Sequence, residues 1–319
     1  MISGHGNPRF TLRQLVYLVA VSRAGGVKQA AQILHVAPSS VSEAITQLEE
    51  SFGLRLFVRL KAHGVRPTSD GVRIIASARQ LLDSAREFEE GAAGLGQGLT
   101  GTLQIGCVKT IAPIILPGLM RRFTERHPGV SIASKVGDQF DLLRGLTVGE
   151  LDLAIIYQMH LDRETDFHPL MTLPPYILLG PALAARFPQE TVSLADMAPY
   201  DLILLDLPVA GDYYLSLFQL EGVAPRIAHR TTALAMVKSL ASNDFGYGLL
   251  NERSINDRAV DGKILSIRAL RGSLPPLTLG VAQPRGMRAT RKTEAFIGTC
   301  RDGLLAGPPD RFFRTAKSI

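Results

Sequence analysis

Three short helical segments separated by tight turns occupy the first fifty residues, and this spacing constrains the fold more than any other feature of the sequence. Apolar residues recur at helical intervals from Leu12 to Ser22, with Thr11 as the expected N-cap and Gly25 as a stop. The same criteria predict a helix over Val27–Leu34 and another over Pro38–Phe52. Two helices joined by so short a turn are typical of a helix-turn-helix unit, whose second helix enters the major groove of DNA.

The predicted third helix combines an apolar stripe with a lightly polar exposed side. Ser39 or Ser40 is expected to cap this helix. The exposed side carries short hydrogen-bonding groups where an ordinary surface helix favours long Lys and Glu side chains. The candidate DNA-binding residues of the predicted helices are Lys28, Pro38, Ser39, Ser40, Ser42, Glu43, Thr46 and Gln47.

A basic hairpin is expected directly after these helices. The alternation from Leu54 to Arg59 predicts a strand, and Val65–Pro67 is expected to return as an edge strand because proline cannot donate to a ladder. Such a hairpin is the wing of a winged helix-turn-helix. Its candidate DNA contacts are Arg55, Arg59 and Arg66, which would neutralise phosphates whatever the base sequence.

The positive charge of the chain is concentrated in the same region. The formal net charge is +6, and residues 1–70 hold eight Lys or Arg against four acidic residues, a net +4. This distribution is expected of a polyanion-binding head on a nearly neutral body. The alternative is an ordinary solvated basic surface, which would give the same count.

The residues of this region resemble the winged helix-turn-helix of the LysR-type transcriptional regulators. The resemblance rests on the segment Phe10–Arg59, FTLRQLVYLVAVSRAGGVKQAAQILHVAPSSVSEAITQLEESFGLRLFVR, followed by GVRPTSDG at Gly64–Gly71. The family commonly has Ser-Gln at Ala37-Pro38 and often Arg at Glu43 and Thr46. Bidentate reading of guanine by Arg is therefore not available on this helix, and Ser, Thr, Gln or Glu43 facing a cytosine amino group must read the bases. The alternative for Glu43 is a solvated carboxylate that repels phosphate.

A long helix with a heptad seam connects this head to the rest of the chain. Apolar residues of the segment from Val72 to about Ala93 recur at alternating steps of four and three, which is typical of a helix that pairs with a second copy. The alternative is packing on its own domain, whereas the resemblance implies antiparallel dimerisation. The candidate dimerisation residues are Ile74, Ala78, Leu81, Ala85 and Phe88.

The remaining two thirds of the chain alternate short apolar runs with helical periodicity, which predicts an α/β fold with a largely parallel sheet. The fold class is therefore multidomain: an α-rich winged helix-turn-helix head, a long dimerisation helix, and a two-lobed α/β effector domain that the resemblance likens to type II periplasmic binding proteins. The expected boundaries are 10–70 for the head, 71–98 for the helix and hinge, 99–306 for the effector domain and 307–319 for a tail. Lobe 1 is expected over 99–166 and 272–306 and lobe 2 over 167–271, with crossovers near Phe167 and Arg271.

Polar residues follow several of the predicted strands, at the places where ligands bind in open α/β sheets. The phrase CVKTIAP places Lys109 and Thr110 at the first strand-to-helix junction, and the resemblance assigns effector binding to the hydroxyl at Thr110. Asp138 at the second junction caps its own helix or selects a ligand that bears hydrogen-bond donors. The candidate effector-binding residues are Cys107, Lys109, Thr110, Asp138, Gln139, Leu205, Asp206 and Thr231.

These observations favour a transcription regulator whose arrangement on promoter DNA is altered by a small molecule held between two lobes. The alternatives are a DNA-binding protein without sequence preference, and an enzyme or small-molecule-binding α/β protein with a basic head. No catalytic or metal-binding motif stands out, so no enzyme activity, metal or cofactor is expected. The expected partners are double-stranded promoter DNA, a second copy in dimers and then tetramers, the effector, and RNA polymerase, with no membrane. The start of the chain lacks the apolar core of an export signal, so a cytoplasmic location is expected.

Overall fold

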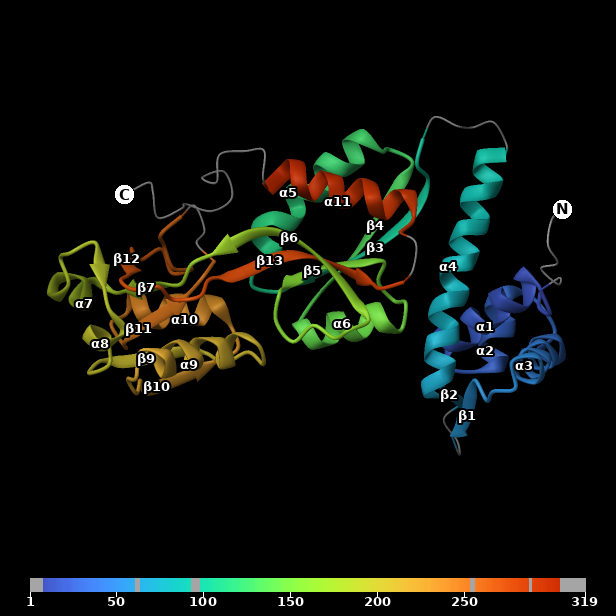
Figure 1. Ribbon diagram of the computed structural model, residues 1–319, viewed down its shortest axis with the longest axis horizontal. Coiled ribbons are helices and arrows are strands. Elements are labelled where there is room, and N and C mark those ends of the chain that lie inside the picture. The colour runs from blue at the N-terminus through green and yellow to red at the C-terminus, as the bar shows by residue number, and fades with distance from the viewer. Residues whose placement is uncertain (1–7, 61–63, 93–97, 253–255, 287–288, 305–319) are drawn as a thin grey trace. The chain divides into compact units, whose positions relative to one another are not determined.

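The computed structural model describes residues 8–60, 64–92, 98–252, 256–286 and 289–304 (Figure 1). The chain divides into two compact units, which are described separately: residues 1–99 with 144–152 form unit 1, and residues 100–143 with 153–319 form unit 2. In the described residues, no helix is long and apolar enough to cross a membrane. The predicted tail at 307–319 lies outside the described residues.

Unit 1 contains the three predicted helices, a two-stranded hairpin and the long helix. Its elements are α1 (Leu12–Ala24), α2 (Val27–Leu34), α3 (Pro38–Phe52), β1 (Phe57–Leu60), β2 (Gly64–Pro67) and α4 (Ser69–Ala92). The strands β1 and β2 pair antiparallel as the wing. Unit 1 is therefore a winged helix-turn-helix followed by a long helix.

Local signals set the helix ends in this unit. Thr11 and Gln14 form a capping box at the start of α1, and Gly25 ends it with a φ of 70° in the left-handed region that glycine favours. The predicted serine cap of α3 is wrong, because Ala37 occupies the N-cap position without a side-chain hydrogen bond. Pro38 opens the helix, so both serines lie inside its first turn and are exposed.

One apolar core holds the three helices and the start of α4 together. Leu18, Val41 and Leu48 are completely buried in it. Leu56 is also fully buried in this core. The strand β1 begins at Phe57 and not at Leu54 as predicted, because its pairing with β2 starts at Phe57 opposite Pro67. Ile75 of α4 packs in the same core with 1% of its surface exposed.

Unit 2 contains two sheets, of which the first has five strands in the order β4-β3-β5-β13-β6. Its elements are β3 (Gly101–Val108), α5 (Ala112–Arg126), β4 (Val130–Gly137), α6 (Gln139–Thr147), β5 (Leu153–Tyr157), β6 (Thr165–Leu173), β13 (Leu277–Pro284) and α11 (Arg291–Leu304). The last turn of α6, from residue 144 onward, is assigned to unit 1. The strands β4, β3 and β5 are parallel, and β13 is antiparallel to both of its neighbours. Figure 1 shows α5 and α11 along one face of this sheet and α6 on the other.

The second sheet has six strands in the order β10-β9-β11-β7-β12-β8. Its elements are β7 (Tyr176–Leu179), α7 (Pro181–Arg186), β8 (Thr191–Val192), α8 (Leu194–Met197), β9 (Asp201–Leu205), α9 (Ala210–Leu220), β10 (Arg226–Thr231), α10 (Leu234–Ser242), β11 (Tyr247–Leu250) and β12 (Ser266–Leu270). The strand β7 is antiparallel to β11 and β12, so both sheets are mixed and only partly parallel. The α/β alternation thus predicts the class correctly. It misses the antiparallel strands β7 and β13, each of which follows a strand of the other sheet along the chain.

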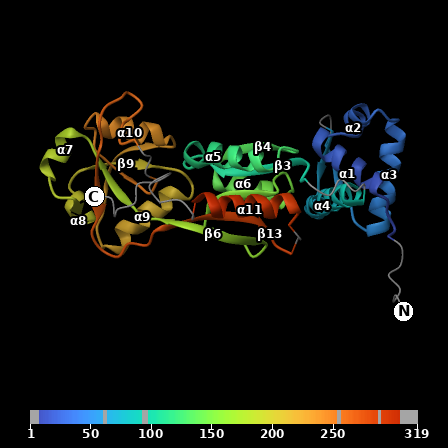
Figure 2. The ribbon, with the colours of Figure 1, turned by 90° about the horizontal axis from the view of Figure 1, so that it is seen from above.

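Two passages connect the sheets of unit 2. The strand β6 pairs with β13 along its whole length in the first sheet, and these two long strands can be followed in Figure 2. The first passage therefore follows Leu173 rather than lying near Phe167. The second passage runs between β12 and β13 at residues 271–276, and Arg271 lies at its start.

Candidate DNA-reading and effector sites

The solvent-facing side of α3 carries the polar residues that the sequence nominates. Ser39, Ser40, Glu43, Thr46 and Gln47 are exposed, as is Pro38 in the first turn, whereas Ser42 is half-buried. The hydroxyl of Thr46 donates to the carbonyl oxygen of Ser42 at 3.1 Å. Because the opposite stripe of the helix is fixed in the core, this side is held in one orientation towards solvent.

A chain of hydrogen bonds joins the start of α1 to this surface. The backbone N–H of Thr11 donates to Oε1 of Gln14 at 2.7 Å, and Nε2 of Gln14 donates to Oε1 of Gln47 at 2.8 Å. Nε2 of Gln47 then donates to Oε1 of Glu43 at 3.2 Å. No local sequence pattern predicts this chain of hydrogen bonds, because the two glutamines lie 33 positions apart.

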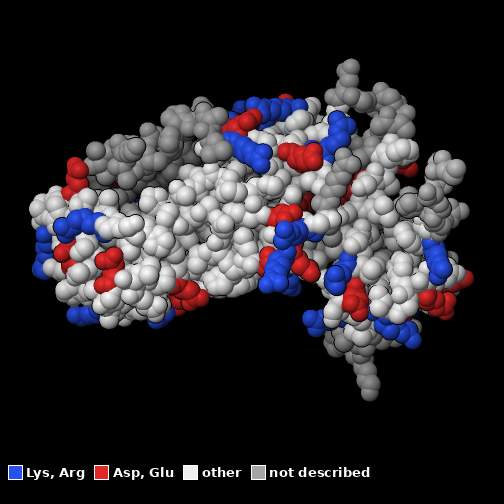
Figure 3. Space-filling view, in the orientation of Figure 1, with Lys and Arg blue, Asp and Glu red and all other residues white. Residues whose placement is uncertain are grey.

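The wing adds basic side chains beside α3. Arg55 has 85% of its side chain exposed, and Arg66 on β2 and Lys28 on α2 are also exposed. Arg59 lies on β1, but its side chain is outside the described residues. On the face shown in Figure 3, basic and acidic side chains of unit 1 are interspersed rather than gathered into one patch.

Glu49 near the end of α3 is a structural residue of the wing. Its Oε1 accepts from the backbone N–H of Leu56 at 2.7 Å and of Phe57 at 3.3 Å, and its Oε2 accepts from Nη1 of Arg55 at 3.2 Å. The carboxylate is only 13% exposed. This one side chain fixes the start of the wing to the end of α3. No local pattern indicates it, because a glutamate near the end of a helix reads as a surface residue.

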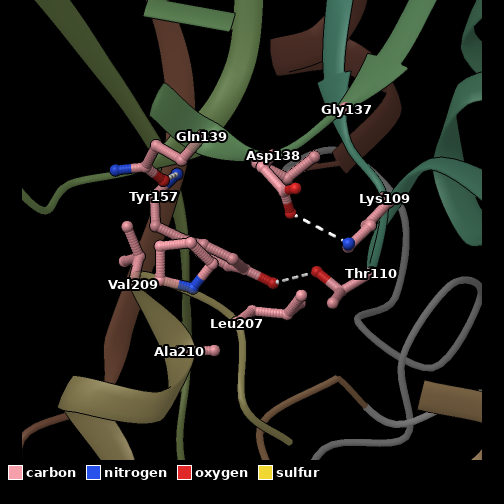
Figure 4. Close-up of a pocket in the computed structure, with 11 residues that line it drawn as sticks. Lys109, Thr110, Gly137, Asp138, Gln139, Tyr157, Leu207, Val209 and Ala210 are labelled. Carbon is pink, nitrogen blue, oxygen red and sulfur yellow. Dashed lines mark hydrogen bonds and ion pairs between the residues drawn. The ribbon is translucent and has the colours of Figure 1, made fainter. Parts of the chain in front are cut away.

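Unit 2 contains a cavity at the carboxyl ends of the parallel strands β3, β4 and β5, with about 340 Å³ of space that is partly open to solvent. The segment 207–210, which follows β9 of the second sheet, forms its other wall (Figure 4). The lining residues are Val108, Lys109, Thr110, Gly137, Asp138, Gln139, Tyr157, Leu207, Pro208, Val209 and Ala210. The cavity thus lies between the two lobes.

Four predicted effector residues line this cavity. Nζ of Lys109 lies 3.0 Å from Oδ1 of Asp138, and each side chain is 35% exposed. The hydroxyl of Thr110 is 2.8 Å from that of Tyr157, and Figure 4 shows both pairs side by side. Gln139 accepts from the backbone N–H of Tyr157 and donates to the carbonyl oxygen of Met159, so its amide holds the end of β5 in place.

Tyr157 gives the cavity a neutral hydroxyl. The residue is buried, and this burial raises the pKa of its phenol well above the ordinary value. The hydroxyl therefore remains protonated at neutral pH and can donate or accept a hydrogen bond. Sequence reasoning misses Tyr157 because it stands at the end of a continuously buried strand, where an apolar role is the ordinary reading.

The other four predicted effector residues do not line the cavity. Cys107 and Leu205 point into the two cores, with 0% and 1% of their surfaces exposed. Asp206 pairs with Arg230 at 3.2 Å, and the hydroxyl of Thr231 accepts from the backbone N–H of Ala233. On the second sheet the cavity wall begins only at Leu207, just beyond the predicted strand end.

The two cysteines are buried thiols. Burial raises the pKa of Cys107 to about 12 and also raises the pKa of Cys300. A reactive redox cysteine needs an accessible thiolate, and neither position provides one. These residues therefore act as small core side chains.

A helix-turn-helix with an exposed reading helix, together with a cavity between two α/β lobes, defines a ligand-responsive transcription regulator. Two family models match the chain: "Bacterial regulatory helix-turn-helix protein, lysR family" over residues 12–72 and "LysR substrate binding domain" over residues 96–305. The chain belongs to the LysR family of transcriptional regulators and carries that family's effector-binding domain.

Known relatives agree with this assignment. The transcriptional activator protein LysR of Escherichia coli is 25% identical over 296 residues, which cover 92% of this chain and 93% of LysR. HinK, a LysR family regulator from Pseudomonas aeruginosa, has a structure with a TM-score of 0.62 and 35% identity, covering 92% of this chain and 99% of HinK. Full-length CbnR, solved in complex with its target DNA, has a TM-score of 0.55 and 20% identity, covering 92% of this chain and 99% of CbnR; this likeness shows the fold alone.

Proposed function

We propose that this regulator reads promoter DNA with α3, grips phosphates with the wing and changes its arrangement on DNA when a small molecule fills the cavity of unit 2. The observation that carries the proposal is the lining of this cavity. Its polar groups stand at strand ends and its opposite wall is apolar, which is the usual composition of a small-molecule site.

The charges of the cavity suggest the kind of effector. Asp138 favours a ligand that bears a positive charge or hydrogen-bond donors, and Lys109 favours an anionic group. A ligand with both a cationic and an anionic group can replace the contact between Lys109 and Asp138, because each side chain then gains a partner of opposite charge on the ligand. The apolar segment 207–210 would contact the remainder of such a ligand.

The protein is proposed to act as a dimer through α4, and as a tetramer built from two such dimers, in the cytoplasm where promoter DNA and RNA polymerase are found. Two-fold symmetry in the protein would be mirrored by two half-sites in the DNA. The effector can shift this assembly only by binding one arrangement more tightly than another.

Competitive selection of fragments of the source genome at near-physiological salt, followed by footprinting, tests the DNA-binding part of the proposal. We expect enrichment of a few sites with two protected half-sites. Equal retention of all fragments would contradict sequence reading and favour a general polyanion-binding head.

The same footprints with a panel of metabolites test the ligand switch. An effector should alter the footprint of the unaltered protein. Thr110→Val should abolish this response and leave the ligand-free footprint intact, whereas Thr172→Val, at an exposed threonine on β6 outside the cavity, should respond normally. Footprints that never change across the panel would count against the switch.

A further inference from the structure

The hydrogen-bond chain on unit 1 fixes which chemical group α3 presents at its centre. Gln14 can accept from the N–H of Thr11 only with Oε1, so its Nε2 is directed at Gln47. Gln47 must then offer its oxygen to Gln14 and its amide nitrogen to Glu43. The capping box of α1 thereby sets the orientation of the side-chain amides of Gln14 and Gln47. The chain of hydrogen bonds ends at the carboxylate of Glu43.

Glu43 is an acceptor that pairs with no cation among the residues that the structure describes. Among the ion pairs of the described residues none involves Glu43, whereas Glu49 on the same helix is paired with Arg55. Gln47 contacts one oxygen of Glu43, and the side chain remains exposed. A carboxylate held this way in a major groove is repelled by the phosphates, and a hydrogen bond from a base donor is needed to offset that cost.

Base chemistry limits what such a group can recognise. Cytosine presents only the donor N4–H₂ in the major groove, together with a C–H edge. Adenine places the acceptor N7 beside its amino group, which repels the second carboxylate oxygen, and guanine and thymine present acceptors alone. A fixed acceptor-only side chain therefore favours cytosine.

We propose that Glu43, held in place by Gln47 and Gln14, reads a cytosine amino group in each half-site. This inference rests on the proposed DNA-reading function and adds a specificity-determining residue with two positioning residues. It predicts one C·G pair per half-site whose preference depends on this hydrogen-bond chain.

The test is selection of full-length protein on a library with randomised half-sites. The unaltered protein should prefer cytosine roughly tenfold at one position of each half-site. Glu43→Ala should remove that preference and leave the other positions unchanged. Glu43→Gln should transfer the preference to adenine, because glutamine pairs with N6 and N7.

A second pair of variants separates positioning from folding and from charge. Gln14→Glu keeps the acceptor of the capping box but removes the donor to Gln47. It should lower the cytosine preference at the same position with an unchanged melting temperature. Glu50→Gln removes one exposed negative charge from the same helix and should strengthen binding on all sequences without changing any base preference.

Three results would overturn the inference. If Glu43→Ala binds all sequences more tightly with the same preferences, Glu43 is a solvated carboxylate. If Gln14→Glu leaves the cytosine preference intact, the hydrogen-bond chain does not position Glu43. If the unaltered protein selects no site, the DNA-reading function itself fails, and this outcome is recognisable because no position shows any preference.

Discussion

At the scale of single residues, Glu252 is a carboxylic acid buried in unit 2, where ionisation of its side chain is unfavourable. The residue is only 1% exposed, and its Oε1 has no hydrogen-bond partner among the described atoms. Burial raises the pKa of the carboxyl to about 7, although the positive charge of Lys238 acts in the opposite direction. The group therefore resists ionisation in the folded protein.

Glu252→Gln should stabilise the protein at high pH. Because the pKa of the folded state lies above the ordinary value of 4.5, ionisation destabilises the native state fully above pH 7, and the penalty disappears as the pH falls toward 4.5. The corresponding free energy is about 3 kcal/mol at pH 8. Urea unfolding of both proteins at pH 5 and pH 8 measures the difference between their free energies of unfolding. This difference should be small at pH 5. A difference of equal size at both pH values would mean that the charge is not the cause.

At the scale of elements, α4 divides its heptad seam between two roles. Ala78 is buried in the core of unit 1, and Ile74 packs against that core. Leu81 and Phe88, further along the same seam, are 42% and 76% exposed. The first half of the predicted dimerisation surface is therefore used within its own unit, and only the second half is left uncovered in this unit.

Replacing the exposed half of the seam should separate the subunits. The double substitution Leu81→Ser and Phe88→Ser removes apolar surface that only a partner would bury. The mass from light scattering should fall by half or more, with the melting transition of unit 1 unchanged. Leu220→Ser, at a leucine of α9 that is 66% exposed, is the matched control and should leave the mass unaltered. An unchanged mass in the double variant would exclude this surface from assembly.

At the scale of the whole effector unit, the buried side chains of Tyr213 and Asn251 form hydrogen bonds to both connections between the sheets. The hydroxyl of Tyr213 donates to the carbonyl oxygen of Pro275 at 2.8 Å and accepts from Nδ2 of Asn251 at 3.0 Å. The same Nδ2 donates to the carbonyl oxygen of Leu173 at 2.7 Å. Leu173 and Pro275 stand at the two passages, so α9 and the end of β11 restrain both of them.

Tyr213→Phe should disrupt these hydrogen bonds. Loss of the hydroxyl leaves a buried donor and a buried acceptor unpaired, which costs about 1–2 kcal/mol and lowers the melting temperature of unit 2 by about 4 °C. Tyr200→Phe is the control, because the ring of Tyr200 packs on Phe187 and its hydroxyl forms no bond given by the structure. Calorimetry measures the melting temperature of unit 2 in both variants. Equal melting temperatures would contradict a stabilising role of the Tyr213 hydroxyl.

Local sequence signals predict the helix-turn-helix, the wing, the α/β class and the strand ends that carry Lys109, Thr110 and Asp138. Each of these depends on a signal within about a dozen residues: a periodic apolar stripe, a cap, a glycine or a proline. When a helix follows a strand, the residues between them lie at the carboxyl end of that strand, independently of the rest of the fold.

The contacts between these elements depend on the packing of the whole chain. This packing brought Tyr157 and residues 207–210 to the cavity instead of Asp206 and Thr231, attached Glu49 to the wing, and divided the seam of α4. It also joined Gln14 to Gln47. These contacts link residues far apart in the chain, and their partners are selected by how whole helices and sheets pack, for which no short segment of sequence carries a signal.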